Sequence, residues 1–138
     1  MHKKPSVLLV DDNAATNFLH GRVLKKSELV GYVHTCTSAR EGLEYISTTN
    51  ENDIYPKPDL IFLDINMPGM SGWEFLEAYR KLPLEQRGQI VIIMLTTSLN
   101  PDDRKRAGTI EEIDDFQEKP LTIPHLKRIL ERHFGERG

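Results

Sequence analysis

The sequence has little of what several common classes of protein need. Only one of its 138 residues, Cys36, is a cysteine, which excludes an internal disulfide framework and fits a reducing compartment. No apolar stretch approaches the roughly 20 residues of a membrane-spanning helix, and the first residues lack the apolar core of a signal peptide. From these absences we expect a cytoplasmic protein that does not enter a membrane.

Motifs for nucleotide and soft-metal binding are missing too. The sequence has no Walker lysine loop and no dinucleotide glycine fingerprint, and its five histidines show no metal-ligand spacing. The net charge of -3 gives no general attraction to nucleic acid or to an anionic membrane. The basic run at residues 104–106 is more typical of a solvated helix face, and no helix-turn-helix follows the last predicted helix. We therefore expect no nucleic-acid partner.

What the sequence does contain fits one globular domain. Hydrophobic residues make up 38% and charged residues 28%, which is ordinary for a soluble protein with a core. A chain of 138 residues is long enough for one such core and hardly long enough for two. We predict a single domain over residues 1–138, with its core at about 5–134, and no output domain.

Five short segments are predicted to be strands. Residues 7–10, 60–63 and 90–95 are apolar at every position, a pattern typical of strands buried on both faces of a parallel sheet. Residues 32–37 and 113–118 have weaker patterns, so we place them at the edges of the sheet.

Helical segments alternate with the predicted strands. Two of them begin with the capping-box pattern, Ser38 with Glu41 and Ser71 with Glu74, and Pro83 is expected to end the second of these.

The first predicted helix follows Asn13, a good N-cap. Its expected buried face consists of Ala15, Leu19, Arg22 and Val23, which share one side at helical spacing.

This alternation predicts an α/β fold. Five βα units give a five-stranded parallel sheet with helices on both faces and right-handed crossovers. With the three apolar strands in the centre, the strand order is 2-1-3-4-5, the doubly wound, flavodoxin-like arrangement. Its switch point, where such sheets bind their ligands, lies between strands one and three.

Polar side chains collect where the central strands of this sheet end. Asp11 and Asp12 follow the first strand, Asp64 ends the third, Thr96 the fourth, and Lys119 follows the fifth. Three carboxylates in one cleft repel each other unless a cation joins them, and oxygen ligands favour Mg²⁺ or Mn²⁺. A carboxylate beside such an ion can attack phosphorus and form an acyl phosphate, with Thr96 and Lys119 contacting the phosphoryl oxygens.

These residues carry a resemblance to a known family. The sequence reads V-D-D-N at 10–13, L-D-I-N-M-P-G-M-S-G at 63–72, L-T-T at 95–97 and K-P at 119–120. Over essentially its whole length the chain resembles the receiver domain of bacterial two-component response regulators, and it looks like the stand-alone type.

The resemblance implies a function for the acidic residues. Asp64 would accept a phosphoryl group from a phosphohistidine on a sensor histidine kinase or a histidine phosphotransfer protein. Asp11, Asp12, Asp64 and the backbone carbonyl of Asn66 would hold Mg²⁺. The protein would be a regulatory phosphoacceptor that catalyses only its own phosphorylation and dephosphorylation, not an enzyme acting on other molecules.

The resemblance also implies how a signal would leave the domain. Thr96 and Phe116 would be the switch residues, with the Phe116 ring turning inward on phosphorylation. The fourth helix, fifth strand and fifth helix would form the face for a downstream protein, and the chain would be a monomer or a phosphorylation-dependent dimer. The bond between Lys119 and Pro120 is expected to be cis. Thr97 and Gln117 depart from the family pattern, in which Ala and an aliphatic residue are more usual.

Three interpretations stay open at this point. The first is a receiver, acting as a signalling switch or as a phosphorelay shuttle. The second is a Mg²⁺-dependent phosphatase with an aspartyl-phosphate intermediate, although such enzymes usually have a second Asp where this chain has Asn66. The third is a receiver-like binding module that is never phosphorylated.

Overall fold

The structure is a computed structural model, and it describes residues 4–87, 90–97 and 100–134. The strands are β1 Val7–Val10, β2 Val33–Cys36, β3 Leu60–Asp64, β4 Val91–Thr96 and β5 Ile113–Glu118. The helices are α1 Ala14–Ser27, α2 Ala39–Ser47, α3 Gly72–Arg80, α4 Leu84–Arg87, α5 Pro101–Gly108 and α6 Ile123–Phe134. The five predicted strands are confirmed within one or two residues.

The strands form one parallel sheet in the order β2-β1-β3-β4-β5, as the sequence predicts. In the register of the sheet, Leu63 of β3 lies opposite Val10 of β1 and Met94 of β4. The carboxyl ends of the three central strands are therefore level, and the residues that follow them meet at one edge of the sheet.

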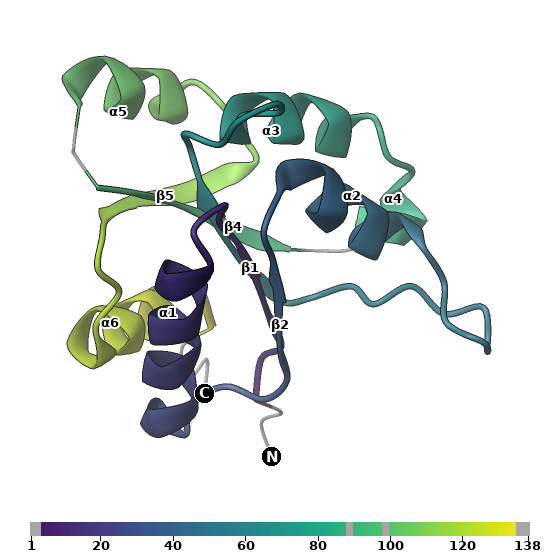
Figure 1. Ribbon diagram of the computed structural model, residues 1–138, viewed down its shortest axis with the longest axis horizontal. Helices are drawn as coiled ribbons and strands as arrows, with labels where there is room; N and C mark the ends of the chain where they lie inside the picture. Colours follow the sequence, from purple (N-terminus) through teal and green to yellow (C-terminus); the bar gives the residue numbers. More distant parts are fainter. Residues whose placement is uncertain (1–3, 88–89, 98–99, 135–138) are drawn as a thin grey trace.

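Helices cover both faces of the sheet (Figure 1). Helices α1 and α6 pack on one face, while α2, α3 and α5 lie over the other. Each face has its own apolar cluster, centred on Leu24, Phe62 and Leu126 on the α1 side and on Ile61, Phe75 and Leu76 on the α3 side. No helix in the described part of the chain is long and apolar enough to cross a membrane.

The predicted buried face of α1 is wrong. Leu19 is 59% exposed, and the helix instead buries Asn17, His20 and Leu24, which lie on one side at helical spacing. Two of these three residues are polar, so a search for an apolar stripe selects the opposite side of the helix. The carboxyl edge of the sheet explains this burial, because Asn17 and His20 hydrogen-bond to backbone groups there.

Two smaller differences concern helix ends. The capping box at Ser71 and Glu74 is present, but Glu41 accepts a hydrogen bond from the Thr37 N–H, although the Ser38 hydroxyl does cap the Glu41 N–H. Helix α3 ends at Arg80, before Pro83, and the proline instead precedes the short helix α4, which the sequence pattern does not reveal. A single turn is too short to show helical periodicity.

Candidate functional site

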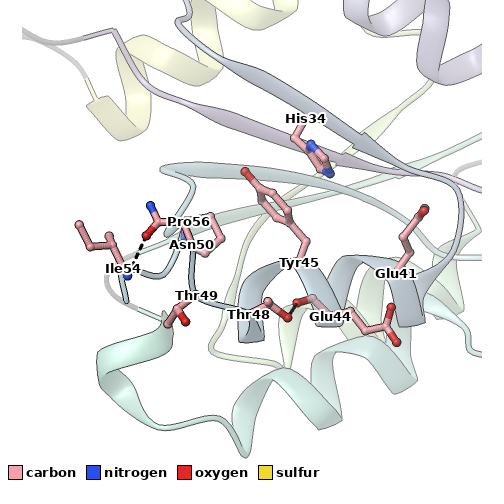
Figure 2. A pocket seen from close by; sticks show the side chains of 9 residues that line it. All are labelled: His34, Glu41, Glu44, Tyr45, Thr48, Thr49, Asn50, Ile54 and Pro56. Carbon is pink, nitrogen blue, oxygen red and sulfur yellow. Dashed lines mark hydrogen bonds between the residues drawn. The ribbon is translucent and has the colours of Figure 1, made fainter. Parts of the chain in front are cut away.

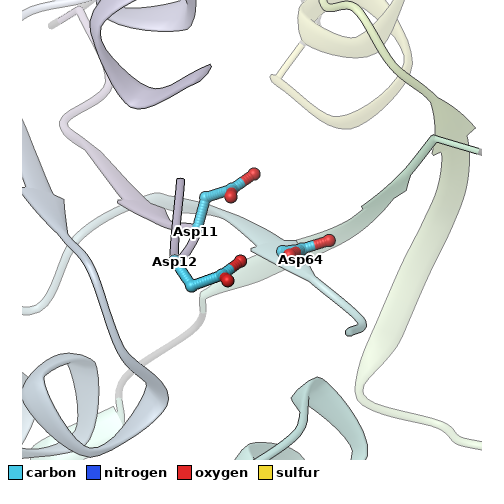
Figure 3. A group of neighbouring side chains, drawn as sticks. All are labelled: Asp11, Asp12 and Asp64. Carbon is cyan, nitrogen blue, oxygen red and sulfur yellow. The ribbon is translucent and has the colours of Figure 1, made fainter. Parts of the chain in front are cut away.

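Three carboxylates meet at the carboxyl edge of the sheet (Figure 3). Asp11 and Asp12 follow β1, Asp64 ends β3, and one carboxylate oxygen of each lies within 4.8 Å of the others. Asp11 and Asp64 are buried, whereas Asp12 is exposed, so the group opens to solvent on one side. We call these three residues the acidic cluster. They lie at the predicted switch point of the sheet.

Lys119 neutralises part of the acidic cluster. Its ammonium group donates to Asp11 Oδ2 at 2.5 Å and to Asp64 Oδ1 at 3.2 Å. Burial lowers the pKa of Lys119, but the hydrogen bond to Asp11 and the two carboxylate charges outweigh that effect and leave the pKa above its ordinary value. The side chain therefore stays protonated as a fixed positive charge beside Asp64.

The negative charge of the cluster exceeds what one lysine compensates. Burial, and then the charge of Asp11, raises the pKa of Asp64 to about 6, against the opposing effect of Lys119. The ionised form of Asp64 is therefore destabilised by burial and by its acidic neighbours, and binding of a cation at the cluster would relieve this repulsion. The side-chain donors of the cluster are all oxygen, which fits a hard divalent ion such as Mg²⁺.

The turn after β3 brings α3 very close to Asp64. Gly69 has φ +81°, which a side chain would disfavour. Gly72 begins α3, its N–H donates to the Ile65 carbonyl at 2.8 Å, and a Cβ at this position would collide with the Asp64 carbonyl oxygen. From the sequence, Gly72 is predicted to have no role beyond its place in the motif at residues 63–72. A glycine immediately after a helix N-cap is the signal that would have found it.

The remaining predicted site residues lie around this edge. Thr96 is buried at the end of β4, and its carbonyl accepts the Lys119 N–H at 2.6 Å. Asn66 is exposed in the loop after β3, and the Lys119–Pro120 bond is cis, as predicted. Phe116 in β5 is buried, with 8% of its surface exposed.

Asn17 and His20 also lie at this edge, and neither is among the site residues predicted from the sequence. The buried polar residues in the described part of the chain are Asp11, Asn17, His20, Asp64 and Thr96. Asn17 donates through Nδ2 to the backbone carbonyls of Asp11 and Cys36, at 3.0 and 3.1 Å. A polar pair three residues apart on the helix directly after the aspartates is the signal for these two positions.

A separate hollow lies away from the acidic cluster (Figure 2). It encloses about 540 Å³ between α2 and the loop that follows it, and the rings of His34 and Tyr45 stack there with centroids 4.0 Å apart. None of the predicted site residues lines this hollow. We therefore place the functional site at the ends of β1, β3, β4 and β5.

The comparisons with known proteins agree with this geometry. The sequence model of the response regulator receiver domain matches residues 7–131. The chain belongs to the response regulator receiver domain family. Among its relatives, the two-component response regulator 24 of Arabidopsis thaliana is 32% identical over 133 residues, which are 94% of this chain and 84% of that protein.

Solved receiver structures share the fold as well. A two-component response regulator from Cytophaga hutchinsonii has a TM-score of 0.82 and 27% identity, covering 98% of this chain and 100% of that one. The phosphorylated cyanobacterial phytochrome response regulator RcpA has a TM-score of 0.75 and 28% identity, covering 95% of this chain and 94% of that one. The chain is thus similar to receivers over nearly all of its length.

Proposed function

We propose that this receiver accepts a phosphoryl group on Asp64 from the phosphohistidine of a sensor histidine kinase or a histidine phosphotransfer protein, with Mg²⁺ bound beside it. The observation that carries the proposal is the position of Asp64. It ends a buried central strand, faces two further carboxylates within 4.8 Å, and accepts a hydrogen bond from Lys119 at 3.2 Å.

Each side chain then has a defined task. A carboxylate oxygen of Asp64 attacks phosphorus, the phosphorus–nitrogen bond of the phosphohistidine breaks, and the imidazole nitrogen keeps the electron pair. Lys119 and the Thr96 hydroxyl contact phosphoryl oxygens as charge develops on them. Asp11, Asp12, Asp64 and the Asn66 carbonyl would hold Mg²⁺, which neutralises negative charge on the carboxylates and on the phosphoryl group when bound.

The relatives support this assignment. RcpA is described as phosphorylated, and a region of the sensor histidine kinase GacS of Pseudomonas protegens is 29% identical to 96% of this chain, which spans 14% of that kinase. By analogy, the partner class here is a histidine kinase or a phosphotransfer protein. We propose a cytoplasmic regulatory phosphoacceptor, rather than an enzyme acting on other molecules, as a monomer or a phosphorylation-dependent dimer.

The two other interpretations are less well supported. A phosphatase needs an acid/base group beside the nucleophile, and the residue two positions after Asp64 is Asn66, which cannot supply one. A binding module that is never phosphorylated has no need for a lysine bonded to two of three clustered carboxylates. The face of α5, β5 and α6 would be the contact for a downstream protein if the receiver acts as a switch through Thr96 and Phe116.

The test is labelling with a small phosphodonor. Acetyl phosphate with Mg²⁺ should add one phosphate to the wild-type protein, visible as a single adduct in the intact mass. Chelation of Mg²⁺ should prevent the adduct, and Asp64→Asn should show none, because the amide cannot replace the carboxylate nucleophile. Asp59→Asn, which changes an acid at the opposite end of β3, is the matched control and should label normally. Equal labelling of Asp64→Asn would refute the proposal.

A further inference from the structure

His20 is a buried histidine with a defined hydrogen-bond partner. It lies on the inner face of α1 with 3% of its surface exposed. Its Nε2 accepts the backbone N–H of Leu121 at 3.2 Å, across 101 positions of sequence. The partner is the second residue after Lys119, so α1 contacts the segment that carries the lysine of the site.

This bond completes a clamp around Lys119. On one side, the Lys119 N–H donates to the Thr96 carbonyl at 2.6 Å. Pro120 has no N–H, so the Leu121 amide is the first backbone donor after Lys119. His20 accepts that donor, and the backbone on both sides of Lys119 is therefore tied to a neighbouring element. The Lys119 ammonium group is thus aimed at Asp11 and Asp64 from a fixed base.

The histidine must be neutral to hold the clamp. Only an unprotonated Nε2 can accept an N–H, which places the hydrogen of the neutral ring on Nδ1. Burial, and then the charge of Lys119, lowers the pKa of His20, so the ring remains neutral near pH 7. The surroundings thus keep the ring in the form that the bond requires.

An apolar side chain could fill the same space but not the same role. It would leave the Leu121 N–H buried without an acceptor, and a buried donor without a partner costs more than the bond itself contributes. The loop would then shift to find a partner, and Lys119 would move with it. Misplacement of a charged group by about 1 Å lowers reaction rates substantially.

We propose that His20 is a positioning residue for phosphorylation, which acts by fixing the backbone that carries Lys119. The inference rests on the proposed phosphorylation of Asp64 and adds a residue to it. The role belongs to the unprotonated Nε2 acceptor rather than to the volume of the ring. A side chain that restores an acceptor at this place should restore the function.

The experiment compares two variants with opposite chemistry. In His20→Leu the acceptor is lost, whereas in His20→Gln the side-chain amide oxygen can take the place of Nε2. The initial rate of phosphorylation by acetyl phosphate, at saturating Mg²⁺, should fall at least about fivefold in His20→Leu. In His20→Gln it should stay within about twofold of wild type.

Leu24→Ala is the matched control for a general loss of packing. Leu24 lies one turn further along the same face of α1, in the same apolar cluster as Leu121, but its side chain cannot accept a hydrogen bond. This variant, folded by circular dichroism, should keep the wild-type rate. Nitrogen NMR of the wild-type histidines provides a second readout, since His20 should show an unprotonated Nε2 at pH 7.

The outcomes separate the two proposals. If wild-type protein acquires no phosphate on Asp64, the proposed function fails. If wild type is phosphorylated and His20→Leu reacts at the same rate, or if His20→Gln loses as much as His20→Leu, the positioning role of His20 is wrong. A protonated Nε2 in the NMR spectrum would also overturn it.

Discussion

Helices α1 and α5 both follow strands that end at the functional site, but they are attached to the sheet in different ways. Helix α1 buries Asn17, His20 and Leu24, and the two polar residues hydrogen-bond to the ends of β1, β2 and β5. In α5 the buried residue is Ala107, and two arginines of this helix make cation–π contacts with aromatic rings of β5 and α3. Arg106 lies 4.4 Å from the Trp73 ring centroid and Arg104 lies 5.9 Å from that of Phe116.

From this difference we expect α1 to be held rigidly against the site and α5 to be held more loosely. Buried hydrogen bonds have a single good geometry, so α1 holds Asp11 and the Lys119 segment in place. Cation–π contacts tolerate sliding and contribute only about 0.5–1 kcal/mol each at exposed positions. We therefore expect α5 to move at a smaller free-energy cost than α1, as the proposed switch would require.

The largest change in the free energy of unfolding should come from truncating the buried side chains of α1 and α5. Leu24→Ala should lower the free energy of unfolding by about 3 kcal/mol, because it empties a fully buried site under α1. Ala107→Gly in α5 should cost only about 1 kcal/mol. Urea denaturation followed by circular dichroism measures both. Equal losses would contradict the comparison.

A smaller effect on the free energy of unfolding should come from the ionisation of Asp64, at the end of β3. The pKa of Asp64 is about 6 in the folded protein and roughly 3.9 in the unfolded chain, so the folded state binds its proton more tightly. Without Mg²⁺, deprotonation destabilises the fold as the pH rises from 4 through 6. Asp64→Asn should therefore be more stable than wild type by about 1–2 kcal/mol at pH 7.5, and this gain should vanish near pH 4.

Added Mg²⁺ provides the control for this pH effect. It should stabilise the wild-type protein at pH 7.5 more than Asp64→Asn, because binding to the folded state raises its stability and the variant has lost one ligand. Thermal unfolding with Mg²⁺ and with a chelator measures the difference. If Asp64→Asn is no more stable than wild type at pH 7.5 in chelator, the charge of Asp64 does not destabilise the folded protein and the prediction is wrong.

The smallest energetic effect should be the response of α5 itself. Beryllofluoride, a mimic of the acyl phosphate, should shift amide NMR signals most strongly from 96 to 108 and from 113 to 120, and least in α1. A switch needs only a small free-energy gap between two packings, so the stability of the rest of the domain should hardly change. Shifts confined to the surroundings of Asp64 would instead favour a relay shuttle.

The sequence predicts the sheet well because its signals are local. The three central strands are runs of apolar residues, and each run leads directly into a polar residue of the site: Asp11, Asp64 or Thr96. Hydrophobicity then separates the three central strands from the two edge strands, and the doubly wound arrangement supplies their order. The acidic cluster and the contact with Lys119 follow from the order of the strands, since their carboxyl ends lie at one edge.

The inner face of α1 could not be predicted in the same way. Its burial depends on the backbone carbonyls of Asp11 and Cys36 and on the amide of Leu121, which come together only in the folded protein. Local periodicity favours Leu19, which is exposed. The close approach of Gly72 to Asp64 is likewise a contact between elements that no apolar pattern records.

The clamp around Lys119 also has a consequence for the order of folding. The bond between His20 and Leu121 spans 101 positions, and the contact between Lys119 and Asp11 spans 108. Contacts of such long range carry a large loop-closure entropy and form late, after the local βα units. A chain emerging from the ribosome would have β1, β3 and all three aspartates before it has the lysine. If Asp64 is phosphorylated as proposed, competence for that reaction should therefore appear only when β5 has docked and Lys119 has reached Asp11 and Asp64.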